Sequence, residues 1–234
     1  MITIRRANDR GKGDYGWLKT AYTFSFANYY DPDFMGFHDL RAINEDVIAP
    51  SRGFDTHDHA DMEIVTWVIS GELTHRDSMG NVGILRANEA QAMSAGTGVS
   101  HSEHNESAIQ PVHLLQIWIE PDAWGKTPVY DQKTFPLEQR RGTQQIIASP
   151  DGRDGSLRIG QDMIVSILHL EKETSFVLAD LAQKSLWIQN IAATFRIQDA
   201  HIRPSDGVAI ENEERVELFC DESGDILLFT APLK

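Results

Sequence analysis

Short runs of β-branched and aromatic residues, each followed by a turn signal, constrain the fold of this chain most strongly. They lie at residues 64–69, 112–119, 163–170, 186–191 and 226–230. Glycine-containing turns separate them, such as Met79-Gly80-Asn81 and Pro150-Asp151-Gly152. No segment shows a long, capped helical periodicity. The sequence therefore predicts an all-β fold built from short strands, a sandwich or a barrel.

A weak internal repeat suggests that this fold occurs twice. The stretch from Leu85 to Met93 runs parallel to the stretch from Ile202 to Ile210, and each follows an apolar strand. The alternative is a chance similarity of two amphipathic strands. The region around residues 125–145 is polar and contains Pro128 and Pro136, as a connection would. We expect two similar β domains, at residues 1–130 and 131–234.

Charge and composition exclude several classes of function. The formal net charge of −14 repels a phosphate backbone and an anionic membrane surface, and the basic residues form no larger group than a pair. We therefore expect no direct contact with nucleic acid and no membrane association, although a protein partner remains open. No apolar stretch approaches the roughly 20 residues of a membrane helix, and no apolar signal core follows Met1, so we expect a cytoplasmic location. The single cysteine, Cys220, excludes an intrachain disulfide and a thiolate zinc site.

Two histidine clusters carry the chemistry. Six of the nine histidines fall between residues 57 and 113. Strand alternation places His57 and His59 on one face, with Glu63 at the same parity. The same period of two places His101 and Glu103 on one face of a second strand.

Two such strands facing each other would bring three imidazoles and a carboxylate to one point. These ligands suit iron, zinc, nickel, copper or manganese. A single His-x-His is weak evidence, because alternating histidines also occur on solvated strands. Two clusters, each opened by glycine and close to an apolar strand, favour a metal site over surface histidines.

The clusters resemble the two motifs of the cupin superfamily. The first fits G-x5-H-x-H-x3-E, loosely at its leading spacing, and the second fits G-x-G-x2-H-x3-N from Gly96 through His101 to Asn105. Five further stretches look like the pirin family: residues 24–32, 35–37, 62–66, 77–81 and 93–98. The similarity covers nearly all of residues 15–120 and continues more loosely to the C-terminus.

The resemblance implies a bicupin, two face-to-face jelly-roll β-barrels with metal in the N-terminal one only. It implies His57, His59, His101 and Glu103 as ligands, with Glu63 as a neighbour. It also implies one divalent transition metal, with Fe(2+) preferred over Zn, Ni, Cu and Mn. Bacterial pirins are associated with quercetinase activity, the O2-dependent opening of a flavonol ring with release of carbon monoxide. Eukaryotic pirin is known as an iron-dependent transcriptional co-regulator.

The chain departs from the family pattern in two places. Asp58 stands between the two histidines where the family usually has proline, and His104 stands where many relatives have tyrosine. By strand parity both side chains should point away from the metal. The second half keeps no His-x-His, and its histidines His169 and His201 lie far apart, so we expect it to lack a metal site.

The resemblance implies two alternative functions for this site. The first is a metal-dependent dioxygenase of the quercetin 2,3-dioxygenase type, in which Glu103 is also the general base for the substrate hydroxyl. Three imidazoles and one carboxylate would leave positions open at a five- or six-coordinate ion, whereas a closed tetrahedral zinc site is the alternative. Aromatic walls for a flavonol are expected from Phe24, Phe26 and Trp67, each of which could equally belong to the core. The second function is a metal-dependent regulatory or interaction protein without turnover.

Overall fold

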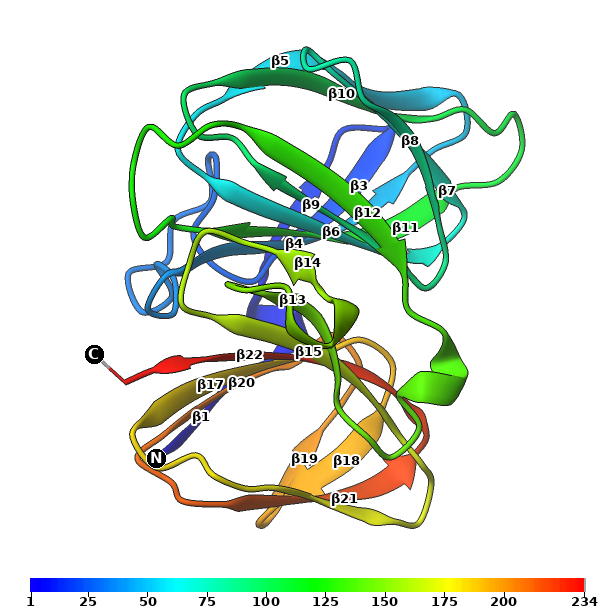
Figure 1. Cartoon of the computed structure of the whole chain (residues 1–234). Coiled ribbons are helices and arrows are strands. Elements are labelled where there is room, and N and C mark those ends of the chain that lie inside the picture. Colours follow the sequence, from blue (N-terminus) through cyan, green and yellow to red (C-terminus); the bar gives the residue numbers. More distant parts are fainter. Residues whose placement is uncertain (234) are drawn as a thin grey trace. The chain divides into compact units, whose positions relative to one another are not determined.

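The computed structural model describes residues 1–233 and confirms the all-β class (Figure 1). Among these residues the only helices are three single turns of 3-10 helix, η1 (Ala7–Asp9), η2 (Leu137–Gln139) and η3 (Arg153–Gly155). None is long or apolar enough to cross a bilayer. All five strand-like runs of the sequence form strands.

The described residues form two compact units. The N-terminal unit comprises residues 11–135 and 157–161, and the C-terminal unit comprises residues 1–10, 136–156 and those from Asp162 onward. This division differs from the expected one chiefly at the beginning of the chain, because β1 (Ile2–Arg5) pairs with β20 (Gly207–Glu211). Residues 157–161 join the N-terminal unit, where the Gly160 carbonyl accepts the amide proton of Asp122 at 2.7 Å.

The N-terminal unit contains two antiparallel sheets. Their strand orders are β12-β9-β6-β11-β4-β3-β2 and β5-β10-β7-β8. The bounds of the first sheet are β2 (Gly11–Asp14), β3 (Leu18–Tyr22), β4 (Leu40–Ile48), β6 (Glu63–Ser70), β9 (Glu89–Ser94), β11 (Val112–Ile119) and β12 (Val129–Thr134). Those of the second are β5 (Arg52–His59), β7 (Glu72–Asp77), β8 (Val82–Arg86) and β10 (Val99–Asn105).

Apolar side chains from both sheets form the core of this unit. Leu73 and Leu85 of the smaller sheet are fully buried against Val68, Val112 and Leu114 of the larger one. Burial on β10 alternates strictly, because successive side chains of a strand point to opposite faces. The inner face of the smaller sheet therefore carries apolar residues at one end and the polar residues of the second motif along β10.

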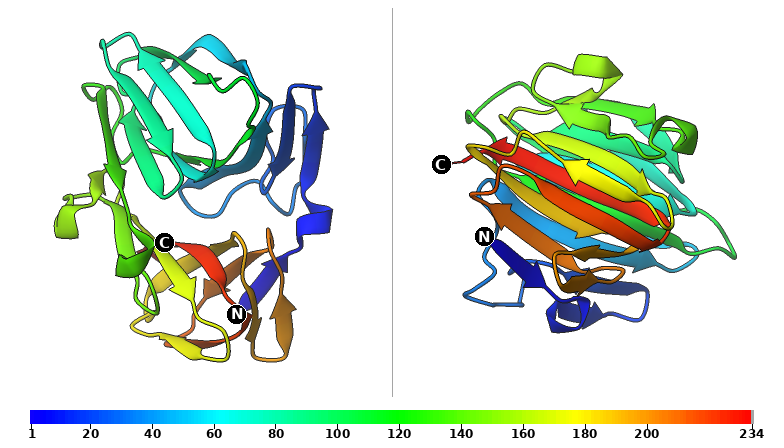
Figure 2. Two further views of the ribbon diagram at one scale, coloured as in Figure 1. Left: turned by 90° about the vertical axis from the view of Figure 1, so that its right-hand side faces the viewer. Right: turned by 90° about the horizontal axis from the view of Figure 1, so that it is seen from below.

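The C-terminal unit repeats the two-sheet plan (Figure 2). One sheet contains the order β1-β20-β17-β22-β15-β13, and the other has the order β16-β21-β18-β19. Its core includes Leu168, Ile188, Phe195, Leu218 and Leu228, all at most 1% exposed. The remaining bounds are β13 (Gln145–Ser149), β14 (Leu157–Arg158, in the N-terminal unit), β15 (Ile164–Leu170), β16 (Ser175–Leu178), β17 (Lys184–Asn190), β18 (Thr194–Ile197), β19 (Ala200–Ile202), β21 (Val216–Glu222) and β22 (Gly224–Pro232).

The internal repeat of the sequence marks the same corner in both units. In the first copy the chain leaves β8, turns, and enters β9 of the other sheet, and in the second it passes likewise from β19 to β20. Asn88 and Ser205 occupy equivalent positions of the repeat, and both are left-handed, with φ of 68° and 66°. Because few residues other than glycine adopt this conformation, its recurrence at matched positions supports a structural repeat.

Asn105, the last residue of the second motif, is a buried side chain at the end of β10. It is 1% exposed. Its amide nitrogen donates to the carbonyls of Ile48, Ala49 and Gln110 at 3.1, 3.2 and 2.8 Å. Its side-chain oxygen accepts the amide proton of Ser107 at 3.1 Å. One side chain thus ties the end of β10 to the end of β4.

We expect Asn105→Asp to destabilise the N-terminal unit more than Asn105→Ala. The alanine leaves the buried carbonyl of Ile48 without this donor, at a cost of about 1–3 kcal/mol, whereas the aspartate directs a carboxylate toward all three carbonyls. Urea unfolding followed by tryptophan fluorescence measures this, since four of the five tryptophans lie in this unit. Equal unfolding midpoints for both variants and the wild type would contradict it.

Candidate metal centre

The predicted ligands lie on adjacent strands of the smaller sheet of the N-terminal unit. His57 and His59 belong to β5, and His101 and Glu103 belong to the neighbouring strand β10 (Figure 1). In the antiparallel ladder His101 stands opposite His57, and Val99 stands opposite His59. A bulge between His101 and Glu103 then shifts the register, so that Glu103 pairs with Phe54. Bulges commonly redirect side chains beside functional sites.

Three of the four predicted ligands, the imidazoles, lie close together. Ring nitrogens of His57, His59 and His101 lie within 4.8 Å of one another. Nε2 of His57 lies 3.1 Å from Nε2 of His101. His101 is 1% exposed, while His57 and His59 are partly exposed. The cluster is therefore buried on one side and accessible on the other.

The charge state of the cluster suits a cation. Burial, followed by the neighbouring histidines, lowers the pKa of His59 to about 4 and that of His101 to about 3. Both rings are therefore neutral at pH 7, which is the form that ligates metal. Nδ1 of His57 lies 2.8 Å from the Asp55 carbonyl, which can only accept a proton. Nε2 of a neutral His57 therefore presents its lone pair to the cluster.

Glu103 lies beside the three imidazoles but in a second grouping. Its carboxylate is within 4.8 Å of ring nitrogens of His75 and His101. It is 2% exposed, and it accepts hydrogen bonds from Nε2 of Gln91 at 2.8 Å and of Gln116 at 2.7 Å. Burial raises the pKa of Glu103 to about 7, although the hydrogen bonds from Gln116 and Gln91 oppose this shift. His101 is common to both groups and links the carboxylate to the imidazoles.

The residues present fit a divalent transition metal. Ring nitrogens of three histidines that lie within 4.8 Å of one another, next to a buried carboxylate, are the imidazole and carboxylate donors that such an ion accepts. Within residues 1–233, both groups of three potential ligands lie in the N-terminal unit. The site contains no thiolate, so imidazole and carboxylate are its ligand types.

The sequence motifs did not identify several residues that contact the predicted ligands. His75 and Asp77 of β7 lie next to β10, with Asp77 opposite His101 and His75 opposite Glu103. The signal was available, because His75 and Asp77 are two residues apart and so share a face of their strand. Gln91 and Gln116 gave no such signal, because only the sheet topology brings them to Glu103.

The other residues predicted to lie near the ligands differ in burial and in contacts. Glu63 is 2% exposed and accepts a hydrogen bond from Ser94 Oγ at 2.6 Å. Phe24 and Trp67 are core residues, 1% and 2% exposed. Phe26 packs edge-on against Trp118 at 5.0 Å, and Trp118 packs edge-on against His59 at the same distance. Of the three aromatic candidates, Phe26 is thus connected to the ligand cluster through Trp118.

The two residues that depart from the family pattern are engaged elsewhere. Asp58 accepts a hydrogen bond from Ser100 Oγ at 2.5 Å. Nε2 of His104 lies 3.5 Å from the Asp55 carboxylate, at the surface. The three-imidazole group includes neither residue, in agreement with their parity on the strands.

A cavity of about 510 Å³ opens beside His57. Trp17 and Phe54 line it and meet edge-to-face at 5.1 Å, and Arg52 and His104 contribute polar groups. A second cavity, of about 420 Å³, lies beside His59. Its lining residues are small or polar, namely Asp58, Ala60, Ser78, Gly98, Val99 and Ser100. Only the first cavity combines a predicted ligand with aromatic walls.

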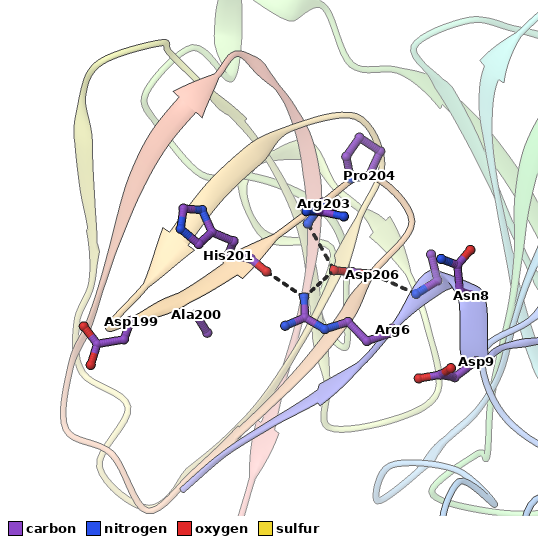
Figure 3. A pocket seen from close by; sticks show the side chains of 10 residues that line it. Arg6, Asn8, Asp9, Asp199, Ala200, His201, Arg203, Pro204 and Asp206 are labelled. Carbon is purple, nitrogen blue, oxygen red and sulfur yellow. Dashed lines mark hydrogen bonds and ion pairs between the residues drawn. The ribbon is translucent and has the colours of Figure 1, made fainter.

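The C-terminal unit has a cavity of about 720 Å³ of different character (Figure 3). Its central carboxylate, Asp206, accepts hydrogen bonds from Nη1 of Arg6 at 2.9 Å and from the backbone amides of Ala7 and Arg203. Arg6 also donates to the His201 carbonyl at 2.6 Å. These interactions tie the N-terminal segment to the β19–β20 corner, so the charges around Asp206 serve the fold.

The buried Glu103 predicts a pH-dependent stability for the metal-free protein. Its folded pKa of about 7 exceeds the ordinary value of 4.5, so the folded state holds the proton more tightly than the unfolded chain. The resulting stabilisation is full below about pH 4.5 and is lost as the pH rises through about 7. Glu103→Gln, which is neutral throughout, should therefore become more stable relative to wild type across this window, by on the order of 3 kcal/mol.

Urea midpoints measured in chelator at several pH values give the difference. Glu45→Gln is a suitable control, because Glu45 is a partly exposed carboxylate of the same unit, paired with His113 at 3.0 Å. Parallel stability curves for Glu103→Gln and wild type would contradict the assignment.

Comparisons with known proteins agree with this architecture. The family described as Pirin matches residues 3–119, and the family described as quercetinase C-terminal cupin domain matches residues 146–231. A protein of Escherichia coli K12 named quercetin 2,3-dioxygenase is 47% identical over 99% of both chains. A pirin-like protein of Caulobacter vibrioides is 34% identical over 99% of this chain and 100% of its own.

Solved structures show the same similarity. The crystal structure of the bacterial pirin YhhW from Escherichia coli in complex with nickel(II) superposes with a TM-score of 0.95, at 45% identity, over 100% of both chains. The family matches, the full-length identity and the shared fold lead to one conclusion: this chain is a member of the pirin family, with the two cupin domains that the resemblance implied.

Proposed function

We propose that this protein is a metal-dependent dioxygenase of the quercetin 2,3-dioxygenase type, which opens a flavonol ring with O2. The observation that carries the proposal is the convergence of three imidazoles within 4.8 Å beside an accessible cavity with aromatic walls. The full-length relative with 47% identity bears the name of this activity. A regulatory protein without turnover would need the metal ligands but not the substrate cavity.

We propose His57, His59, His101 and Glu103 as the residues that hold the metal. A divalent transition metal in this site would supply a Lewis acid with open positions for the reactants. Fe(2+) remains our first choice, with Ni, Zn, Cu and Mn as alternatives, and the nickel complex of a related pirin supports a divalent ion. The Glu103 carboxylate already lies within 4.8 Å of a ring nitrogen of His101, and each of its oxygens keeps a lone pair beside the hydrogen bond from Gln91 or Gln116.

The cavity beside His57 is the proposed flavonol site. Trp17 and Phe54 offer ring faces and edges for an aromatic bicycle, and Arg52 offers a positive charge to the acidic hydroxyls of a flavonol. Its volume of about 510 Å³ is in the range of small-molecule pockets. The substrate would thus lie against the exposed side of the imidazole cluster.

Glu103 is the proposed general base. Its carboxylate lies next to His101 and is shielded from water, so it can accept the proton of the 3-hydroxyl of a flavonol placed at the cluster. Gln91 and Gln116 would hold the carboxylate oxygens in place while the proton moves. General-base catalysis of this kind contributes about 10²–10⁴-fold.

We expect the metal-loaded protein to consume O2 and release carbon monoxide when quercetin is added. His57→Ala should lose both metal and activity, because it removes one of the converging imidazoles. Glu103→Gln should retain some metal but turn over at least tenfold more slowly per bound ion. Oxygen electrode traces, normalised to metal content, measure these effects.

The control for this experiment is wild-type protein stripped of metal and assayed in the same buffer. Full metal loading without oxygen uptake above that control would refute the dioxygenase proposal and favour the regulatory one. Unchanged turnover per ion in Glu103→Gln would refute only the base, and Glu63 would then be the first carboxylate to test.

Phe54→Ala should raise the KM for quercetin several-fold and leave metal content unchanged, because it removes one aromatic wall but no ligand. Ser78→Ala is the matched control, since Ser78 lines the polar cavity beside His59. Steady-state kinetics for both variants distinguish the two cavities. A KM effect confined to Ser78→Ala would place the flavonol in the polar cavity instead.

A further inference from the structure

A chain of hydrogen bonds leads from Asp77 through His75 to His101. Nε2 of His75 lies 3.3 Å from Oδ2 of Asp77, and Nδ1 of His75 lies 3.4 Å from Nδ1 of His101. The side chains of His75 and Asp77 are both 0% exposed. The far nitrogen of His101, Nε2, points at Nε2 of His57. Each ring nitrogen of His75 and His101 therefore faces a partner. Which nitrogens carry a proton follows from Asp77, where the series of hydrogen bonds begins.

Asp77 can act only as an acceptor here. Its Oδ1 accepts the backbone amide protons of Met79 at 3.0 Å and Asn81 at 2.9 Å. Its Oδ2 accepts from the side-chain amide of Asn81 at 2.9 Å. A carboxylate with three donors already on its two oxygens requires that His75 present N–H to it as well. His75 therefore carries its proton on Nε2.

The proton on Nε2 decides the state of the next ring. In a neutral imidazole the other nitrogen is an acceptor, so Nδ1 of His75 presents a lone pair to His101. The hydrogen bond between the two rings then needs the proton of His101 on Nδ1. Nε2 of His101 is left with its lone pair, directed toward His57 and the centre of the imidazole cluster.

We propose that Asp77 and His75 are positioning residues that hold His101 as the Nδ1-protonated tautomer, with Nε2 prepared for the metal. This inference rests on the proposed metal site and names the residues that prepare it. Carboxylate–imidazole contacts of this kind typically change metal affinity by about 10–100-fold. Here a second imidazole is inserted between the carboxylate and the ligand.

Packing supports this role. The ring of Tyr130 stacks on His75, with centroids 4.4 Å apart and planes inclined by 15°. His75 is thereby clamped in the orientation that directs one nitrogen at Asp77 and the other at His101. His57 obtains the equivalent orientation from a backbone carbonyl, that of Asp55. The orientation of His101 depends instead on two side chains, so substitution can test it.

Asp77→Asn tests the direction of these hydrogen bonds with little change in side-chain shape. The backbone amides of Met79 and Asn81 would keep the side-chain oxygen of the asparagine, so its amide nitrogen would face His75. An N–H in that place favours the reversed chain, with the proton of His101 on Nε2. We expect nickel affinity, measured by titration calorimetry, to fall about 10–100-fold.

Nitrogen-15 NMR of the metal-free protein reports the tautomers directly. We expect His101 to be protonated on Nδ1 in wild type and to shift toward Nε2 protonation in Asp77→Asn. His75→Phe keeps the stacking on Tyr130 but removes the acceptor, and it should lose nickel affinity to a similar extent. His75→Asn restores an acceptor close to the position of Nδ1 and should recover part of that affinity.

His113→Gln is the matched control, because it breaks another histidine–carboxylate pair of the same unit, with Glu45, away from the ligands. Its nickel affinity should equal that of wild type. Wild-type His101 protonated on Nε2, or an Asp77→Asn variant with unchanged tautomer and affinity, would overturn the proposal. If wild type binds no nickel, the proposed metal site fails, whereas the NMR result still decides the tautomer of His101.

Discussion

The pairing of β10 with β5 on one side and β7 on the other is the interaction on which the candidate site depends. One residue of β10, His101, stands opposite His57 in the first ladder and opposite Asp77 in the second. The backbone hydrogen bonds of the two ladders therefore set the positions of His57 and Asp77 relative to His101. A slip of one residue in either ladder would turn these side chains to the opposite face of the sheet.

Burial of polar side chains on this face has an energetic cost that the structure offsets with specific partners. Gln91 and Gln116 supply donors to Glu103, and Asp77 with His75 supplies an acceptor to His101. Burial still dominates, since the pKa of Glu103 is raised and that of His101 is lowered. Without metal the site therefore holds a poorly solvated carboxylate beside neutral imidazoles, an arrangement that a divalent cation would stabilise.

The strands and the three-imidazole cluster could be predicted from sequence because both follow the period of two. Residues 57, 59 and 101 obey it, and so do the buried positions of β10. The same reasoning could not separate core from cavity: Trp67 is enclosed in the core, whereas Trp17 and Phe54, which were not singled out, line the cavity. A buried aromatic and a cavity-lining aromatic have the same local pattern, and only the packing of distant segments distinguishes them.

The sequence by itself determined the all-β class, the repeated corner at Asn88 and Ser205, and the identity of the converging histidines, because local alternation and short motifs encode them. Tertiary structure alone decided which residues support the ligands and to which unit the first ten residues belong. Gln91 and Gln116 reach Glu103 from different strands, and β1 pairs with β20 some two hundred residues away. Contacts of such long range depend on how the sheets assemble, so no local pattern records them.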